Sequence, residues 1–112
     1  MSQTPFNFIA HLRAKSGSEQ ALKDALMACV APTRAEAGNV NYDLHQGQDD
    51  PAVFVIYEGW KGHDALEAHF KTPHFKTLMA AAEELVAERG PDNKPFIAEA
   101  LVMVSDIASL KP

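Results

Sequence analysis

Four side chains suited to acid–base or aromatic chemistry lie within one short stretch of this chain: Glu58, Trp60, His69 and His74. Histidine titrates near neutral pH, so a positioned imidazole can accept or shuttle a phenolic proton. Tryptophan offers a flat apolar wall to an aromatic ligand. The same side chains would also suit a core in which a histidine and a tryptophan merely fill space. The residue types alone leave both interpretations open.

The spacing of these residues predicts that three of them meet. His69 shares a helical face with Leu66 and Phe70, so we expect His69 to point toward a sheet. Trp60 closes a strand on the same alternating face as Glu58. If that face looks at the helices, Trp60, Glu58 and His69 line one concavity. His74 follows a helix break, where it either edges the pocket or caps the preceding helix end.

A metal site is not expected from this pattern. His69 and His74 lie five residues apart across a proline, whereas a helical pair of zinc ligands lies four apart. No second acidic–histidine pair supplies further ligands. The chain has no glycine-rich phosphate loop, nucleophile elbow or Cys–His pair. We therefore predict neither a metal nor an organic cofactor.

Four segments read as strands and hold these residues in place. They combine alternating or continuous apolar side chains with turn residues at their ends, and they span 6–14, 39–46, 52–60 and 94–104. A helix is predicted between the first two strands. It is introduced by a capping box of Ser16 and Glu19 and stopped at Gly38. A second helical segment starts at Gly62 and is broken at Thr72-Pro73, where a new helix begins.

The predicted order of elements is β-α-β-β-α-β, with the second helix broken in two. This order is typical of an α+β, ferredoxin-like split fold. We expect one domain over residues 1–112, with its core at about 6–104. The third and fourth strands are apolar on both faces, although helices cover only one face of such a sheet. A homodimer through sheet faces, a dimeric α+β barrel, is therefore predicted.

Composition narrows the class of partner. Acidic residues outnumber basic ones by 15 to 10, and the net charge is −5. We therefore expect no nucleic acid and no membrane as partner, since both favour a basic patch. Cys29 is the one cysteine and cannot close an internal disulfide. With no signal-like start and no long apolar run, the sequence predicts a cytoplasmic protein.

Three motifs in register carry a resemblance to a known family. They are Thr-Arg-x-Glu-x-Gly-Asn at 33–39 followed by Tyr42, Tyr-Glu-x-Trp at 57–60, and His-Phe-Lys-Thr-Pro-His at 69–74. Together they resemble the antibiotic biosynthesis monooxygenase domain, from about residue 6 to residue 104. The resemblance implies a homodimer with a pocket between the sheet and the helices of each subunit.

This resemblance favours a functional site over core filling. The predicted catalytic pair is His69, which would handle a proton, and Trp60, which would form the wall for a small aromatic substrate. Around this pair, the expected substrate-binding residues are Glu58, His74, Tyr42, Phe8, Ile56 and Phe70. In such a pocket a hydroquinone would be deprotonated, and oxygen would react with the electron-rich anion.

Three functions stay open at this point. Characterised members of the family include oxygenases that act on quinol-like aromatics without metal or flavin, which makes a cofactor-independent monooxygenase the first hypothesis. The isomerase branch carries a similar Thr-Pro-His turn, so an isomerase or lyase of a small metabolite, with or without a phosphate group, is the second. A non-catalytic small-molecule-binding protein is the third. Trp60 favours the first, because a planar wall suits a planar substrate.

Overall fold

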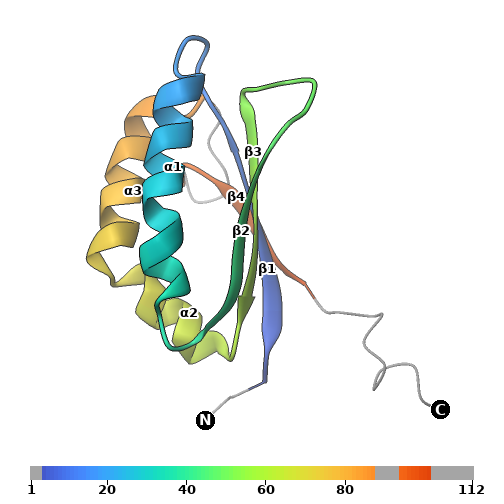
Figure 1. The fold of residues 1–112 in the computed structure, drawn as a ribbon, viewed down its shortest axis with the longest axis vertical. Helices are drawn as coiled ribbons and strands as arrows, with labels where there is room; N and C mark the ends of the chain where they lie inside the picture. The colour runs from blue at the N-terminus through green and yellow to red at the C-terminus, as the bar shows by residue number, and fades with distance from the viewer. Residues whose placement is uncertain (1–3, 88–93, 102–112) are drawn as a thin grey trace, which may run out of the picture.

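A four-stranded antiparallel sheet carries the helices of the described residues on one face (Figure 1). The computed structural model describes residues 4–87 and 94–101. Its strands are β1 (Phe6–Arg13), β2 (Asn39–Gln46), β3 (Val53–Trp60) and β4 (Ile97–Leu101), and its helices are α1 (Glu19–Arg34), α2 (His63–Phe70) and α3 (Pro73–Leu85). The strand order β2-β3-β1-β4 is that of the ferredoxin-like fold. The predicted element order is therefore confirmed.

The last strand is described only in part. It was expected over 94–104, and the structure shows it from Ile97 to Leu101. Residues 102–104 and the tail 105–112 lie outside the described residues. β4 pairs with β1 at the edge of the sheet. Its alternation brings Ala98 onto the face where Ala10 is buried, because these two residues are register partners.

Sheet register places the site residues in rows. Glu58 of β3 is paired with Phe8 of β1 on one side and with Tyr42 of β2 on the other. Paired residues project to the same face of a sheet, so these three side chains stand side by side. Ile56 stands in the next row, opposite Ala10. This face is covered by the helices, and Tyr42, Glu58 and Ile56 are buried there.

The break between α2 and α3 occurs where the sequence predicts it. Thr72 is the N-cap of α3, and its Oγ1 accepts a hydrogen bond from the backbone N–H of Phe75. The same hydroxyl donates to the carbonyl of His69 at 2.7 Å. Pro73 fills the first position of α3, where its missing N–H costs nothing. Thr72 thus fixes the end of α2 and the start of α3 together.

The start of α1 differs from the predicted capping box. The helix begins at Glu19, with Ser18 rather than Ser16 at the N-cap, and Ser18 makes no side-chain cap bond. The Glu19 carboxylate instead accepts from the backbone N–H of Gly17 at 3.0 Å. Gly17 has φ +89°, a left-handed conformation that glycine adopts cheaply. The tight turn at Gly17 therefore places Ser16 outside the helix.

The segment between α1 and β2 is a short, well-anchored turn. The backbone N–H of Glu36 donates to the carbonyl of Thr33, and that of Asn39 donates to the carbonyl of Glu36. Gly38 passes against Ala65 of α2 so closely that a Cβ at this position would clash. The helix ends at Arg34, before Gly38. The close approach of the turn to α2 brings Glu36 near the end of that helix.

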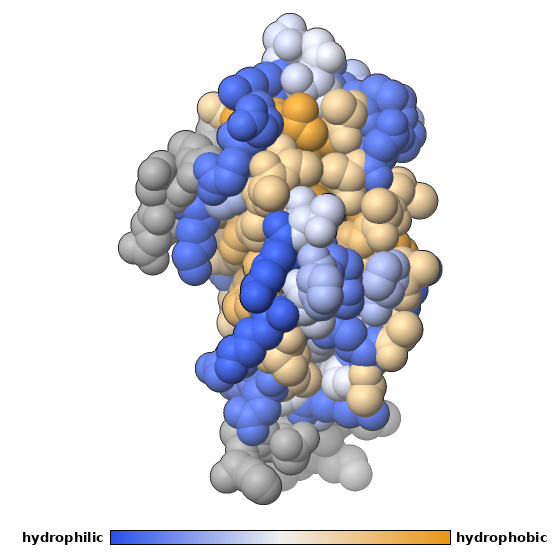
Figure 2. Space-filling view, turned by 90° about the vertical axis from the view of Figure 1, so that its left-hand side faces the viewer, coloured by the Kyte–Doolittle hydropathy of each residue, from blue (hydrophilic) through white to orange (hydrophobic). Residues whose placement is uncertain are grey.

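The helix layer has a mixed outer surface. Hydrophilic and apolar residues both reach this surface (Figure 2). Met27 of α1 is one exposed large hydrophobic residue, at 54%. In the part of the chain that the structure describes, no helix has the length and apolar character needed to cross a bilayer.

Candidate functional site

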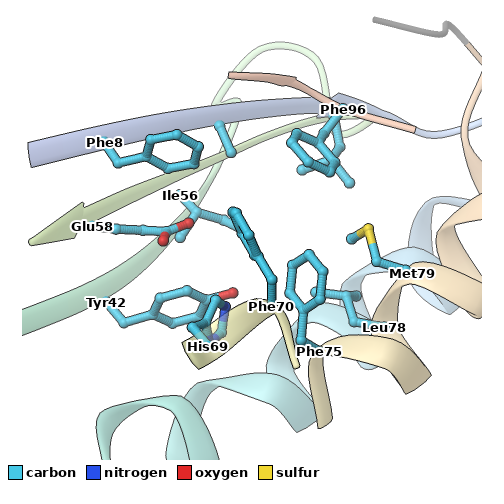
Figure 3. A pocket seen from close by; sticks show the side chains of 12 residues that line it. Phe8, Tyr42, Ile56, Glu58, His69, Phe70, Phe75, Leu78, Met79 and Phe96 are labelled. Atoms are coloured by element: carbon cyan, nitrogen blue, oxygen red, sulfur yellow. The ribbon is translucent and has the colours of Figure 1, made fainter. Parts of the chain in front are cut away.

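A small cavity lies between the sheet and the helices, and six of the eight predicted site residues line it. These six are Phe8, Tyr42, Ile56, Glu58, His69 and Phe70. The remaining lining residues are Ala10, Leu12, Phe75, Leu78, Met79 and Phe96. The wall is therefore mostly apolar and aromatic, with Glu58, Tyr42 and His69 grouped on one side (Figure 3). None of these lining residues is a lysine or an arginine.

A larger hollow adjoins the cavity. The inner cavity has a volume of about 20 Å³, which is room for roughly one water molecule. The hollow beside it measures about 310 Å³. Phe70, Phe75, Met79 and Phe96 line both spaces. Figure 3 shows the rings of Phe70 and Phe75 rising from the helices toward the sheet. These two rings divide the polar end of the inner cavity from the outer hollow.

Trp60 does not take the position predicted for it. Its side chain is completely buried and is not part of the cavity wall. It packs against His69, with ring centroids 4.8 Å apart, and its Nε1–H donates to Glu58 Oε1 at 2.9 Å. Strand alternation correctly puts Trp60 on the helix-facing side. However, its position at the end of β3 leaves it behind Glu58 and His69 rather than beside the cavity.

His74 also lies elsewhere than at the cavity edge. It neither lines the cavity nor caps α2, since it sits in the first turn of α3. Its Nε2 lies 2.6 Å from Oε2 of Glu36. The same carboxylate oxygen lies 2.7 Å from Nδ1 of His69. One glutamate from the α1–β2 turn thus joins the two histidines that flank the helix break.

Glu36 is the site residue that sequence reasoning missed. It falls inside the Thr-Arg-x-Glu-x-Gly-Asn motif, but it lies far from both histidines along the chain and outside every predicted strand face. Only the packing of the α1–β2 turn against α2 brings it to them. Its presence in that motif was the one signal available.

Glu36, His69 and His74 form a set of three potential metal ligands, with ligand atoms all within 4.8 Å of one another. The expectation that the chain supplies no third ligand is therefore wrong. The two nitrogens, however, lie at hydrogen-bond distance from one oxygen, at 2.7 and 2.6 Å. Ligand atoms around a tetrahedral zinc ion stand roughly 3.3 Å apart. The observed spacing fits hydrogen bonding better than metal coordination.

Burial shifts the pKa values of the two acid–base groups of the cavity, His69 and Glu58, in opposite directions. Burial lowers the pKa of His69, although its bond to Glu36 opposes the shift, so its imidazole is neutral at pH 7. Burial raises the pKa of Glu58 to about 7, against the opposing effect of the Trp60 N–H. Burial also raises the pKa of Tyr42 above its ordinary value, so its phenol stays protonated. The cavity therefore presents a neutral base beside a carboxyl group that is close to half protonated at neutral pH.

Glu58 should make stability depend on pH. Its pKa rises from 4.5 in the unfolded chain to about 7 in the fold, so the folded protein holds a proton that the unfolded chain releases between these values. This contribution to stability is complete below pH 4.5 and is lost as pH rises through 7. Relative to Glu58→Gln, the wild type should lose up to about 3 kcal/mol across this window. Urea unfolding from pH 4.5 to 8 measures it.

Glu67→Gln is the matched control for this experiment, because Glu67 is an exposed glutamate on α2. Its stability should follow the wild type at every pH. If the Glu58→Gln and wild-type curves run parallel, Glu58 ionises as easily in the fold as in the unfolded chain, and the expected neutral-pH titration is wrong.

The chain matches the model of the antibiotic biosynthesis monooxygenase family over residues 5–81. This protein belongs to the antibiotic biosynthesis monooxygenase family. Rv0793 of Mycobacterium tuberculosis, which carries a provisional name as a monooxygenase, is 32% identical over 83 residues, which are 74% of this chain and 81% of Rv0793. YcnE of Bacillus subtilis carries a similar provisional name and is 31% identical over 78 residues, 70% of this chain and 82% of YcnE.

Solved structures of other proteins share the fold of this chain. PA3566 of Pseudomonas aeruginosa is 38% identical, with a TM-score of 0.78 over 88% of this chain and 92% of PA3566. The structure of Rv0793 gives a TM-score of 0.81 over 93% of this chain and 99% of its own. An Escherichia coli isomerase of (4S)-4-hydroxy-5-phosphonooxypentane-2,3-dione is 41% identical over 59 residues, 53% of this chain and 59% of the isomerase. The relatives of this chain therefore carry names for more than one reaction.

Proposed function

We propose that this protein is a cofactor-independent monooxygenase that acts on a quinol or a related small aromatic compound. The observation that carries the proposal is the pairing of a neutral histidine, His69, with a protonatable carboxyl group, Glu58, in one cavity whose other walls are apolar and aromatic. Relatives with provisional monooxygenase names support it.

The chemistry requires a base, the substrate and oxygen. His69 takes a phenolic proton, and the electron-rich ring anion then reacts with O2 at a ring carbon to form a peroxide. Loss of water leaves a hydroxyquinone, so quinol plus O2 gives hydroxyquinone plus H2O. One oxygen atom enters the product and the other leaves as water. Glu58 in its protonated form can hydrogen-bond to the developing peroxide oxygen.

Substrate entry in this proposal uses the outer hollow. The inner cavity alone is too small for an aromatic ring, whereas the adjoining hollow of about 310 Å³ is of ligand size. The side chains of Phe70 and Phe75 would turn aside to open the inner cavity. The aromatic ring of the substrate would then lie among Phe75, Met79 and Phe96, with the substrate hydroxyl group toward His69. Aromatic side chains in offset or edge-on contact suit such a ligand.

The experiment is oxygen uptake with a panel of quinols. The expected result is one O2 consumed per quinol, with one atom of ¹⁸O2 incorporated in the product. Elemental analysis and a visible spectrum of the same preparation should show no stoichiometric metal, heme or flavin. Oxygen uptake equal to the rate without protein, across the whole panel, would contradict the proposal.

An isomerase of a small hydroxyketone is the second candidate, and one observation favours it. Proton abstraction from one carbon and return to another needs two proton-transfer groups facing one cavity, as His69 and Glu58 do. The same feature fits the similarity to the Escherichia coli isomerase. The inner cavity has no lysine or arginine among its described lining residues, which argues against a phosphate at that end. Exchange of substrate protons with ²H2O without oxygen uptake would identify this reaction.

We also propose that the protein is a homodimer joined through the sheet face opposite the helices. That face carries Ile9, Val55 and Tyr57, all half-buried, and Ile97, which is 46% exposed. Register pairs Ile9 with Tyr57 and places His11 between Val55 and Ile97, so this face carries a patch of apolar side chains from β1, β3 and β4 around one histidine. A second copy of this patch would cover it.

Light scattering after gel filtration at micromolar concentration tests this assembly. The expected mass is twice the 12.2 kDa of one chain. Val55→Lys puts a charge in the middle of the patch and should shift the protein toward monomer, because an unpaired buried charge costs several kcal/mol. Asp24→Lys, on the outer side of α1, is the control and should remain dimeric. A folded wild-type monomer at this concentration would refute the assembly.

A further inference from the structure

We propose that Glu36 is the positioning residue of this site. Its carboxylate holds His69 by Nδ1, so that Nε2 is the nitrogen that takes the substrate proton, and His74 anchors the same carboxylate from the other side. This inference rests on the proposed function, in which His69 is the base. It gives a role to Glu36 and His74, neither of which lines the cavity.

The geometry at the Glu36 carboxylate carries the first step. Oε2 lies 2.7 Å from Nδ1 of His69 and 2.6 Å from Nε2 of His74. An ionised carboxylate oxygen can only accept hydrogen bonds, so both imidazoles donate to it. Donor–acceptor distances this short are typical of charge-assisted bonds. His69 therefore carries its proton on Nδ1.

The position of the proton on His69 decides which nitrogen can act. A neutral imidazole has one protonated and one basic nitrogen. Among the described residues, the imidazole of His69 makes its hydrogen bond through Nδ1, and its ring lines the cavity. Nε2 is thus the nitrogen left with a lone pair for a ligand. When Nε2 takes a proton, the imidazolium forms next to the Glu36 carboxylate, which stabilises it.

Burial assigns different roles to the two histidines. The side chain of His69 is 2% exposed, that of Glu36 is 15% exposed, and that of His74 is 21% exposed. His69 is also fixed by its packing against Trp60 and Phe75. His74 reaches Glu36 from the outer side, away from the cavity. Its bond keeps the carboxylate turned toward His69, as outer partners of a catalytic or ligating histidine commonly do.

The first test needs no substrate. Long-range ¹H–¹⁵N spectra of ¹⁵N-histidine-labelled protein should show His69 protonated at Nδ1 and His74 protonated at Nε2 near pH 7. In Glu36→Gln the pKa of His69 should fall, because the bond to Glu36 raises it in the wild type. Glu67→Gln, an equal change of charge at an exposed position of α2, should leave both signals unchanged. Finding His69 protonated at Nε2 in the wild type would overturn the proposal.

The second test uses a substrate found by the oxygen-uptake screen. Glu36→Gln should lower kcat at least about tenfold with a smaller change in KM. It should also move the acidic limb of the kcat/KM profile to lower pH, because the neutral form of His69 is the active one. His74→Gln places an amide N–H where Nε2 stood, so it should keep most of the activity that His74→Ala loses. Glu36→Gln with unchanged kcat and pH profile would refute the positioning role.

The two proposals fail separately. If no quinol is consumed but the spectra show the expected protonation, the positioning of His69 stands and the proposed reaction is wrong. If quinols are consumed and the spectra show His69 protonated at Nε2, the reaction stands and the role of Glu36 is wrong. One equivalent of a transition metal retained by Glu36, His69 and His74 in the purified protein would also overturn the hydrogen-bonded arrangement.

Discussion

His69→Asn should lower turnover by roughly 10²-fold to 10⁴-fold while the protein stays folded. An asparagine amide N–H can occupy the place of Nδ1 and still donate to Glu36, but it offers no basic nitrogen to the cavity. A positioned general base typically contributes a rate factor of that size. The variant thus removes Nε2 and keeps the hydrogen bond of the buried Nδ1, which lies 2.7 Å from the carboxylate. Steady-state oxygen uptake and thermal melts of the same samples measure both effects.

Two further variants separate chemistry from packing at this position. His69→Ala should lose the same activity and also some stability, because it deletes a ring that packs against Trp60 and Phe75 and leaves Glu36 with one partner fewer. Leu66→Ala, one helical turn earlier in α2, should lose about 2–5 kcal/mol of stability through a core cavity. Its folded fraction should keep turning over. If His69→Asn retains near-wild-type turnover, His69 is not the base.

Trp60→Ala should destabilise the fold by about 3–5 kcal/mol, the usual range for deleting a buried aromatic ring. The side chain is completely buried, and its loss would open a void next to His69 at the end of β3. It would also leave Glu58 without the N–H that it accepts at 2.9 Å. Urea unfolding monitored by circular dichroism measures the change, since the variant has no tryptophan for fluorescence.

Trp60→Phe tests the polar contribution of the indole. It keeps most of the packing and removes Nε1–H, so its stability loss should be well below that of the alanine variant. The Trp60 hydrogen bond lowers the pKa of Glu58, so its removal should raise that pKa above about 7. ¹³C spectra of the labelled carboxyl group would follow the titration directly. An unchanged titration in Trp60→Phe would show that the indole acts on Glu58 through packing alone.

Trp60 also shows how a correct face assignment can give an incorrect role. We expect a substitution of Trp60 to change substrate binding through Glu58 and His69, because the Trp60 ring stands behind these two side chains. A reduced affinity in Trp60→Phe would therefore accompany a changed Glu58 titration, rather than the loss of a flat wall for the ligand.

The sequence by itself determined the strand faces, the helix break and most of the cavity. Alternation along a strand is a local property with a period of two, so it places Glu58 and Ile56 on one face without knowledge of the partner strand. Thr72 and Pro73 mark a helix start for equally local reasons, the hydroxyl acceptor and the absent N–H. Six of the eight predicted site residues consequently line the cavity.

Tertiary structure alone decided how the two histidines are used. On a continuous helix, residues five apart point about 140° away from each other. The break at Thr72-Pro73 and the turn before β2 instead aim His69 and His74 at one oxygen of Glu36. That arrangement depends on the approach of Gly38 to Ala65, a contact between segments far apart in the chain. Local periodicity cannot report such a contact, because it depends on how separate elements pack.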